Sequence, residues 1–351
     1  MLLRHLHSFA SPARSLARHV NTVARPRVLC AAAAITGSAA GAVSAACIAK
    51  QGQETNPLLA QPSLFPRYAD ICAEHVSPAL EERLAVAEAA LCQLEATITS
   101  KLQAGVTPSY GELNDEAERI SELVSAPWSA VNHLKSVKDE ESLRKAVQAT
   151  QPKVVRFSTR MSQSAALYRG WCALRADKEA WTALSGTQRR VAELEIRTAE
   201  LAGIGLEGAA KVRFNEIAEE LAALSTSFGN NVLDATKAFS LTLTDKSAVA
   251  GLPESALAQM AATARRKGQA EATAADGPWV VTLDGSCVMA VLRSADDAKL
   301  RETVYRAHVT KASEFDSKDN APIISSILAL RRERAALLGF ESHAEVSLAK
   351  K

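Results

Sequence analysis

The sequence predicts a mainly α-helical fold that contains one small two-stranded β element. The longest apolar stripe of the chain, from Phe214 to Phe239, recurs every three or four residues, close to the 3.6-residue period of an α-helix. Several other stretches keep the same period. The period changes to two only around residues 239–244, which is typical of a strand, and WVVTL at 279–283 offers that strand a partner.

The first 53 residues have the composition of an organellar transit peptide. They contain no acidic residue, and their six basic ones are Arg4, Arg14, Arg18, Arg25, Arg27 and Lys50. Residues 28–49 are uncharged, but their Ala, Gly and Ser make a poor bilayer span, so we interpret them as the rest of a cleavable leader. A membrane anchor and a second organellar routing signal are the alternatives. We expect residues 1 to about 50 to be removed or disordered.

The folded region, 54–351, is expected to start near Asn56 in the soluble interior of a mitochondrion or chloroplast, with a cytoplasmic location as the alternative. Prolines at 57, 62 and 66 predict an extended arm, after which helices dominate. The first helix, 79–102, has an apolar stripe made of Leu80, Leu84, Ala87, Leu91, Leu94 and Ile98. Thr107 to Ser109 is a start signal for a helix that runs to about Val124.

Pro127 and Pro152 are predicted to interrupt helices, and Pro152 to open the next one. That next helix carries Val154, Val155, Phe157, Met161, Ala165 and Tyr168. Residues 184–187 combine a helix stop with an N-cap, so a further helix should reach Leu201 and end at Gly203 and Gly205.

The central helix, 214–239, directs one face to the core and the other to water. The water-facing residues are Asn215, Glu216, Glu219, Glu220, Asn230 and Lys237. Gly229 should cost about 1 kcal/mol relative to Ala and offers a place for a bend or a close contact. The remaining helices are expected over residues 253–267, 295–311 and 322–338, the last ending at Gly339.

Charge and cysteine content exclude several classes of protein. The net charge is +2 and the leader holds six basic residues without an acid, so the remainder has a charge of 2 − 6 = −4. A mildly acidic body argues against a nucleic-acid partner. The six cysteines include no Cys-x-x-Cys pair, which argues against a metal cluster and a secreted disulfide framework. Buried, reduced thiols fit the cytosol, a mitochondrial matrix or a stroma.

Several strings occur in one order between Asn56 and Lys351. They are NPLL at 56–59, EHVSPAL at 74–80, HLKSVKDEESLR at 133–144, GIGL at 203–206, EIAEELAALSTSFGNNVLDAT at 216–236, GLPESALA at 251–258, LRETVYRAHVTKAS at 300–313 and ILALRRERAALLGFESHAEVSLAKK at 327–351. In this order the chain resembles the amino-terminal half of the oligopeptidase A and thimet oligopeptidase family, zinc metallopeptidases that cut short peptides. The resemblance implies a helical, clam-like enzyme whose deep cleft admits short unfolded peptides, including cleaved targeting peptides.

A zinc peptidase of this kind uses His-Glu-x-x-His on a helix, because two imidazoles four residues apart can share one metal while the Glu activates water. No His-Glu pair occurs in the chain. Three histidines lie in the leader, His5, His7 and His19, and the others, His75, His133, His308 and His343, are at least 35 residues apart.

The resemblance implies that the metal motif belongs to a second half of a chain about twice this length. We therefore expect the catalytic half to be absent and zinc to belong to the full-length enzyme. We predict no catalytic, cofactor-binding or metal-ligating residue in this chain, which alone should neither bind zinc nor cleave peptides.

Weaker candidates have simpler structural explanations. The Glu74 and His75 pair suits a helix-start cap better than an acid–base pair. The basic run Arg265, Arg266 and Lys267 before Gly268 could bind an anion, as could Arg331, Arg332 and Arg334, but basic residues are expected at a helix end from the helix dipole alone. We find no Gly-rich phosphate loop, no Gly-x-Ser-x-Gly elbow and no Cys with a nearby His.

The first functional hypothesis is the channel-wall part of an organellar metallo-oligopeptidase, which handles short peptides together with its catalytic half. The alternatives are a non-catalytic helical module that binds peptides or another subunit, from a truncated gene or splice form, and an incomplete gene model. No nucleic acid and no membrane is expected as a partner. Self-association is expected through an apolar surface near the C-terminus that comprises Ile323, Ile324, Ile327, Leu328, Leu330, Leu337 and Leu338.

Overall fold

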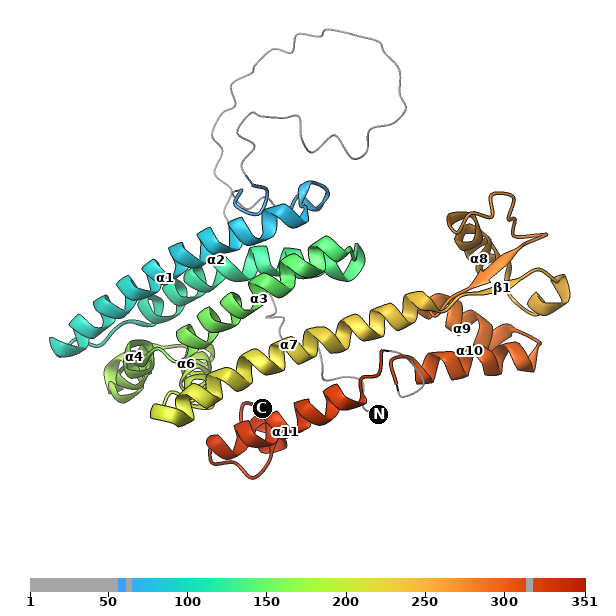
Figure 1. Ribbon diagram of the computed structural model, residues 1–351. Helices are drawn as coiled ribbons and strands as arrows, with labels where there is room; N and C mark the ends of the chain where they lie inside the picture. Colours follow the sequence, from blue (N-terminus) through green and yellow to red (C-terminus); the bar gives the residue numbers. More distant parts are fainter. Residues whose placement is uncertain (1–55, 61–64, 314–317) are drawn as a thin grey trace, which may run out of the picture. The chain divides into compact units, whose positions relative to one another are not determined.

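The computed structural model describes residues 56–60, 65–313 and 318–351, and the predicted leader lies outside these residues. The described residues belong to one compact unit, Glu54–Lys351. The unit is mainly α-helical, as the sequence predicts (Figure 1). Its helices are α1 (Ala73–Gln103), α2 (Tyr110–Val137), α3 (Glu141–Ser162), α4 (Ala165–Ala176), α5 (Lys178–Ala183), α6 (Gly186–Leu201), α7 (Gly208–Ala238), α8 (Glu254–Arg266), α9 (Gly285–Ser294), α10 (Ala298–Thr310), α11 (Ala321–Leu337) and α12 (His343–Leu348).

The largest core lies among α1 to α6. Helix α1 packs on α2, α3 and α4, and its predicted stripe is confirmed, since Leu80, Leu91 and Ile98 are almost fully buried and only Leu84 is half-buried. Ser109 caps α2 and forms a capping box with Glu112, as the start signal predicts. These helices form because each buries one apolar stripe against its neighbours.

Among the described residues, three prolines lie beyond the first turn of a helix, and this corrects the predicted breaks at Pro127 and Pro152. Pro78 lies inside α1, Pro127 inside α2 and Pro152 inside α3. An internal proline removes one backbone hydrogen bond and costs about 3 kcal/mol, which the burial of a long apolar stripe can offset. The helix predicted across residues 152–168 instead divides at Gln163 and Ser164, where Ser164 caps α4.

The turn before the central helix requires glycine at one position. Helix α6 starts at the predicted cap, where Ser185 and Gln188 form a capping box. It ends before Gly203, which has φ of 79°, and a Cβ on this residue would lie 2.9 Å from the Leu206 side chain. The chain can therefore turn here only with glycine, and the turn leads into α7.

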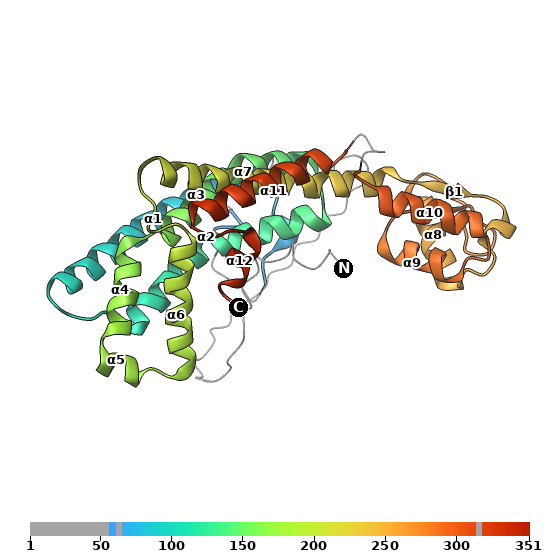
Figure 2. The same cartoon turned by 90° about the horizontal axis from the view of Figure 1, so that it is seen from below.

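Helix α7 confirms the predicted central helix, although its burial differs from the prediction. It packs on α3 and α11, and Figures 1 and 2 both draw α11 alongside it. Phe214, Ile217 and Ala235 are buried, while the middle of the stripe, Leu221, Leu224, Phe228 and Val232, is only half-buried. Asn230, predicted to face water, is buried at 9% exposure. Gly229 makes no close contact; it is exposed, and the helix continues through it.

A second core surrounds the two strands. Strands β1 (Leu241–Leu243) and β2 (Trp279–Val281) pair antiparallel with Thr242 opposite Val280, which confirms the predicted β element. Helices α8, α9 and α10 supply the other buried residues, among them Met260, Val291 and Val304. Helix α9 was not predicted, and α10 begins at Ala298 and not at Ala295.

The last two helices form a small third cluster. Leu201 of α6, Ala335 of α11 and Val346 of α12 are its buried residues. Helix α11 was predicted almost as observed, whereas the short helices α12 and α5 were not. On α11, Ile324 and Leu328 are 45% and 59% exposed and Leu330 is buried; the other four residues of the predicted apolar surface are half-buried.

The predicted extended arm is wrong for residues 56–59, and part of it, residues 61–64, lies outside the described residues. Asn56 accepts a hydrogen bond from the Leu58 amide and donates one to the carbonyl of His75 at 2.8 Å, so residues 56–59 turn back on the bundle. Within the described ranges, no helix is both long and apolar enough to cross a membrane.

Candidate functional site

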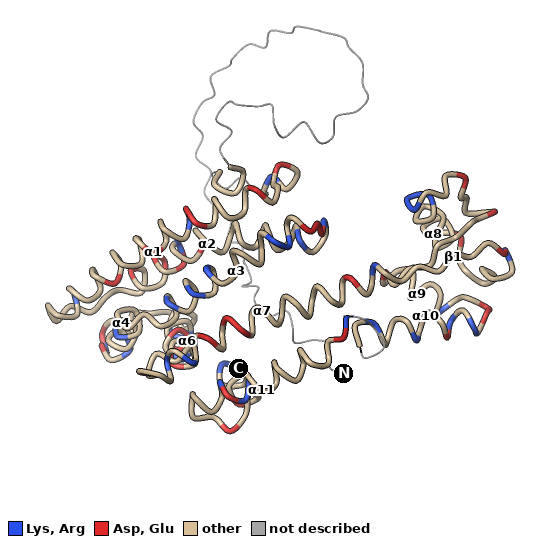
Figure 3. The backbone as a smooth tube through the Cα atoms, viewed as in Figure 1, with Lys and Arg blue, Asp and Glu red and all other residues tan. Residues whose placement is uncertain are grey.

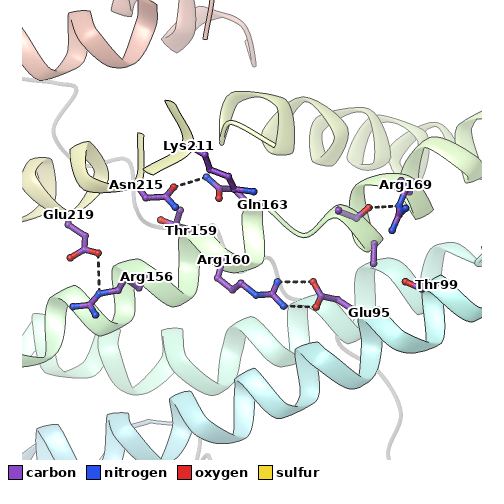
Figure 4. Close-up of a pocket in the computed structure, with 12 residues that line it drawn as sticks. Glu95, Thr99, Arg156, Thr159, Arg160, Gln163, Arg169, Lys211, Asn215 and Glu219 are labelled. Atoms are coloured by element: carbon purple, nitrogen blue, oxygen red, sulfur yellow. Dashed lines mark hydrogen bonds and ion pairs between the residues drawn. The ribbon is translucent and has the colours of Figure 1, made fainter. Parts of the chain in front are cut away.

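A polar groove lies between α1, α3, α4 and α7 (Figure 4). Its volume is about 560 Å³, and a neighbouring hollow of about 450 Å³ between α1 and α3 shares Arg156 and Arg160 with it. The groove is lined by Glu95, Thr99, Arg156, Thr159, Arg160, Gln163, Ala165, Ala166, Arg169, Lys211, Asn215 and Glu219. The four basic side chains outnumber the two acidic ones, so the groove has a surplus of positive charge.

Arg160 is fixed by an ion pair at the floor of the groove. Its two terminal nitrogens donate to the two carboxylate oxygens of Glu95 at 2.7 and 2.6 Å, and Ser164 donates to the same carboxylate. These hydrogen bonds, that from Arg160 above all, hold the pKa of Glu95 below its usual value against the opposing effect of burial. Because the ion pair is bidentate, it fixes the position of α1 relative to α3.

The wall that faces α7 is held by two further contacts. Arg156 pairs with Glu219 at 3.1 Å, and Gln163 donates to Asn215 and to the carbonyl of Ala202, both at 2.8 Å. These interactions connect α3 and the residue after it with α7, so the groove is built into the helix packing.

Two cations of the groove lack an acidic partner among the described residues. The Arg169 side chain donates only to the carbonyl of Ala165 at 3.2 Å, and the Lys211 side chain makes no hydrogen bond or ion pair with the described residues. They can receive a carboxylate or a peptide carbonyl. The groove lining includes no His, Cys or Asp. Sequence reasoning missed this site, although Glu88 and Glu95, seven residues apart, and Arg156 and Arg160, four apart, each share a helix face.

The structure scatters the four histidines that follow the leader. His75 lies in the first turn of α1, His308 on α10, and His343 begins α12. The ring of His133 lies against that of Tyr68, with centroids 5.2 Å apart and planes tilted by 53°. No three His, Cys, Asp or Glu residues of the described ranges come together as a metal site.

His75 is a helix cap, as the sequence favoured, but the expectation of no Cys with a nearby His is wrong. The amide of Cys72 donates to Nδ1 of His75 at 3.2 Å, and the two side chains meet at 3.3 Å between Sγ and Nδ1. Burial, followed by the hydrogen bond to Glu74, raises the pKa of the Cys72 thiol. The thiol is therefore protonated at neutral pH and is no activated nucleophile.

The basic run at the end of α8 serves the local structure. Arg265 donates to the carbonyl of Ala272 at 2.5 Å, and Arg266 donates to Thr263 at 2.9 Å. Gly268 follows with φ of 96° and ends the helix. Both guanidinium groups thus close the turn, in agreement with the simpler of the two explanations.

Two family models match the chain. One, the N-terminal domain of neurolysin and thimet oligopeptidase, covers residues 86–211, and the other, peptidase family M3, covers residues 291–351. The chain is 43% identical over 297 residues to the probable cytosolic oligopeptidase A of Arabidopsis thaliana, across 85% of this chain and 41% of the relative.

The organellar oligopeptidase A of the same plant, described as chloroplastic/mitochondrial, is 41% identical across 85% of this chain and 36% of the relative. The oligopeptidase A of Salmonella typhimurium is 37% identical over 301 residues, or 85% of this chain and 42% of the relative. The chain thus spans about two fifths of the length of these curated relatives.

The helical fold and the two matched models define a chain of the M3 peptidase class. Within that class, the chain belongs to the oligopeptidase A and thimet oligopeptidase family, as the resemblance in sequence predicted. The zinc that this family implies does not fit the described residues, because their histidines lie apart and no three potential ligands converge. No catalytic step can therefore be derived from them.

Proposed function

We propose that this chain is the helical, non-catalytic part of an organellar oligopeptidase A that degrades short unfolded peptides, including cleaved targeting peptides. The observation that carries the proposal is the 43% identity over 297 residues to a relative named oligopeptidase A, of which the chain spans 41%. The zinc and the water-activating residues would belong to the catalytic half, and residues 54–351 would form a wall of the peptide channel.

Two structural features support a role in binding. The groove between α1, α3, α4 and α7 is built into the helix packing and offers Arg169 and Lys211 to a peptide carboxylate or carbonyl. Helix α11 exposes Ile324 and Leu328, and each Å² of apolar surface left in water forgoes about 25 cal/mol. A catalytic half that covers this surface would stabilise the chain.

A complementation experiment in trans tests the proposal. The purified chain is mixed with the catalytic half of a related oligopeptidase A, and both cleavage of a quenched fluorescent peptide and the melting temperature are measured. We expect the mixture to cleave the peptide and the chain to melt at a higher temperature. The double substitution Ile324→Ser and Leu328→Ser should weaken both effects, because it removes the apolar contact.

Val137→Ser is the matched control, because Val137 is 68% exposed but lies on α2. It should leave both effects unchanged. If the chain is instead a dispersed monomer whose melting temperature does not change when the catalytic half is added, the proposal is contradicted. That result would favour the second function, which is described next.

The second function is a self-contained module that binds peptides, and the unpaired cations of the groove favour it. Fluorescence anisotropy with labelled short peptides and the chain alone tests it. Binding that Lys211→Gln and Arg169→Gln weaken would support the module. Binding that they leave unchanged would exclude the groove as its site.

The organellar location rests on the acid-free leader and on the organellar relative. Amino-terminal sequencing of protein recovered from its native compartment should find a start near residues 51–55. An intact Met1 would contradict removal of the leader and favour the cytoplasm.

Metal analysis of the dialysed chain completes these tests. We expect no stoichiometric zinc, because the described residues bring no ligand set together. One tightly bound zinc per chain would contradict the assignment of the metal to the catalytic half.

A further inference from the structure

The corner where α11 meets α12 and α7 contains an arginine whose side chain has no hydrogen bond or ion pair with the described residues. The guanidinium group of Arg334 lies 5.0 Å above the ring centre of Phe214, and its Nε is buried without a hydrogen-bond partner in the described part of the chain. A buried cation that lacks an anion is costly. Stacking on a ring recovers only about 0.5 to 2 kcal/mol, so the guanidinium still offers its fork of donors.

Two further basic groups act on the same place, and the acid next to Arg334 on α11 is already bound. Arg331 lies one turn before Arg334, and His343 begins α12; neither has an ion pair within the described residues. Glu333, the acid nearest to Arg331 and Arg334 in sequence, is already bound to Arg213 of α7 at 2.6 and 2.9 Å. Glu341 and Glu345, two residues to either side of His343, are exposed, and the carboxylate of Glu345 accepts from the Glu341 amide at 3.0 Å. The two arginines therefore have no acid left on their own helix.

The electrostatics agree with that arrangement. Burial, followed by the charges of Arg331 and Arg334, lowers the pKa of His343, and burial followed by Arg331 lowers the pKa of Arg334. Lys350 after α12 also has a lowered pKa, through burial first, and Glu195 of α6 opposes that shift. Glu195 thus faces Lys350, and His343 faces positive charge from α11.

The floor beside these cations is apolar. Leu201, Ala335 and Val346 are buried there, Leu338, Phe340 and Ala349 pack against them, and Leu348 at the end of α12 is 59% exposed. An inorganic anion would leave this apolar surface in water. A protein segment can cover it with an apolar side chain while a neighbouring carboxylate reaches the cations.

We propose that Arg331, Arg334 and His343 form a docking site for an acidic segment of a partner protein in which carboxylates alternate with apolar side chains. One carboxylate of the segment accepts hydrogen bonds from the guanidinium of Arg334, and Arg331 and His343 complete its surroundings. The segment's apolar neighbours cover Leu348. The site is separate from the peptide groove, so it does not depend on the function proposed above.

A nuclear magnetic resonance titration tests the site on the whole chain. The ring signal of His343, assigned through its loss in His343→Gln, is followed against pH with and without the peptide acetyl-Leu-Asp-Leu-Glu-Leu-amide. We expect the acidic peptide to raise the pKa of His343, because a nearby carboxylate favours the imidazolium form. The neutral peptide acetyl-Leu-Asn-Leu-Gln-Leu-amide should leave it unchanged.

Arg334→Gln should weaken binding of the acidic peptide by about tenfold or more, because it removes a charge-assisted pair of hydrogen bonds. Arg332→Gln is the matched control, since Arg332 carries the same charge on the same helix but is exposed, and it should change affinity less than about twofold. Urea unfolding reports whether each variant is folded, and if Arg334→Gln is not, Arg331→Gln takes its place.

Three results would overturn the proposal. The neutral peptide could bind as tightly as the acidic one, the substituted arginine could leave binding unchanged, or inorganic phosphate could displace the peptide and shift His343 equally. The last result would assign the corner to a small anion. None of these results bears on peptide cleavage in the complementation experiment, so the two proposals fail separately.

Discussion

The bundle of α1 to α6 and the corner of α11 and α12 differ in the partners that they provide for similar residues. In the bundle, Leu91 and Ile120 are fully buried in a large core, and Arg160 is bound by both oxygens of Glu95. In the corner the buried cluster is small, and Arg334 has a ring but no carboxylate. Figure 3 shows basic and acidic residues distributed along the helices of both regions. The two regions thus do not differ in the kinds of residue they contain. They differ in whether the chain supplies a group that is complementary to each charged or apolar side chain.

The largest expected effect concerns the two cores. Leu91→Ala should lower the free energy of unfolding by about 2–5 kcal/mol, because a fully buried leucine leaves a cavity. Val346→Ala, at the edge of the small cluster, should cost only about 1.5 kcal/mol, the transfer energy of two methylene-sized groups. Urea unfolding followed by circular dichroism measures both. Equal losses would show that the corner is as well packed as the bundle.

The next effect concerns the two arginines. Glu95→Gln should lower the free energy of unfolding by about 1–2 kcal/mol, because it leaves Arg160 without its bidentate partner in a half-buried position. Arg334→Gln should leave the stability of the isolated chain unchanged or raise it, because the variant removes a charge that forms no ion pair with the described residues. Destabilisation by Arg334→Gln as large as that by Glu95→Gln would indicate a carboxylate partner within the chain.

Acid should affect the two regions at different pH values. Arg144 of α3, followed by Lys237 of α7, holds the pKa of Asp139 down, from 3.8 to about 2. Because the folded-state pKa is lowered, the contribution is complete above the unfolded value near 4 and disappears as the pH falls towards 2. It amounts to on the order of 2 kcal/mol. Asp139→Asn should remove this part of the acid sensitivity in urea titrations.

In the corner the folded-state pKa of His343 lies below its usual value of 6.5, so the unfolded chain binds a proton first. Stability should therefore decline as the pH falls below about 6.5, a higher pH than in the bundle. Hydrogen exchange resolved by segment should show α12 losing protection before α3. The reverse order would contradict the assigned environments. His343→Gln should abolish the early loss, while the decline near Asp139 persists.

The smallest effect lies on α7, the helix that contacts both α3 and α11. Gly229→Ala should raise the free energy of unfolding by about 0.5–1 kcal/mol, because the position is exposed, lies within the helix and has open space for a Cβ. A thermal melt followed at 222 nm measures the shift. A loss of stability would mean that the glycine is needed for a contact that the isolated chain does not make.

Local chemistry was predictable wherever neighbours in sequence decide the structure. Ser109 with Glu112 and Ser185 with Gln188 start their helices at the predicted places, because a capping box is made by residues three apart. The change of period at Phe239 likewise revealed the strand. The family was recognisable for a related reason, since colinear strings remain readable without any knowledge of their contacts.

Predictions failed where distant contacts outweigh local preference. Pro127 stays inside α2 because the helix buries Val124, Val131 and the proline itself. Asn230 carries a polar side chain on a helix face that period counting assigns to water, yet it is buried. The groove escaped notice because Glu95 and Arg160 are 65 residues apart.

The sequence by itself determined the helical class, the position of the β element and the family, because periodicity, capping residues and colinear strings are properties of the chain order. The tertiary structure decided which charges are matched. Glu95 and Arg334 look alike as charged residues on amphipathic helices, and only the packing of α1 on α3, and of α11 on α7, gives one a partner and leaves the other with a ring. Electrostatic energy depends on distance and burial, which the order of residues does not contain.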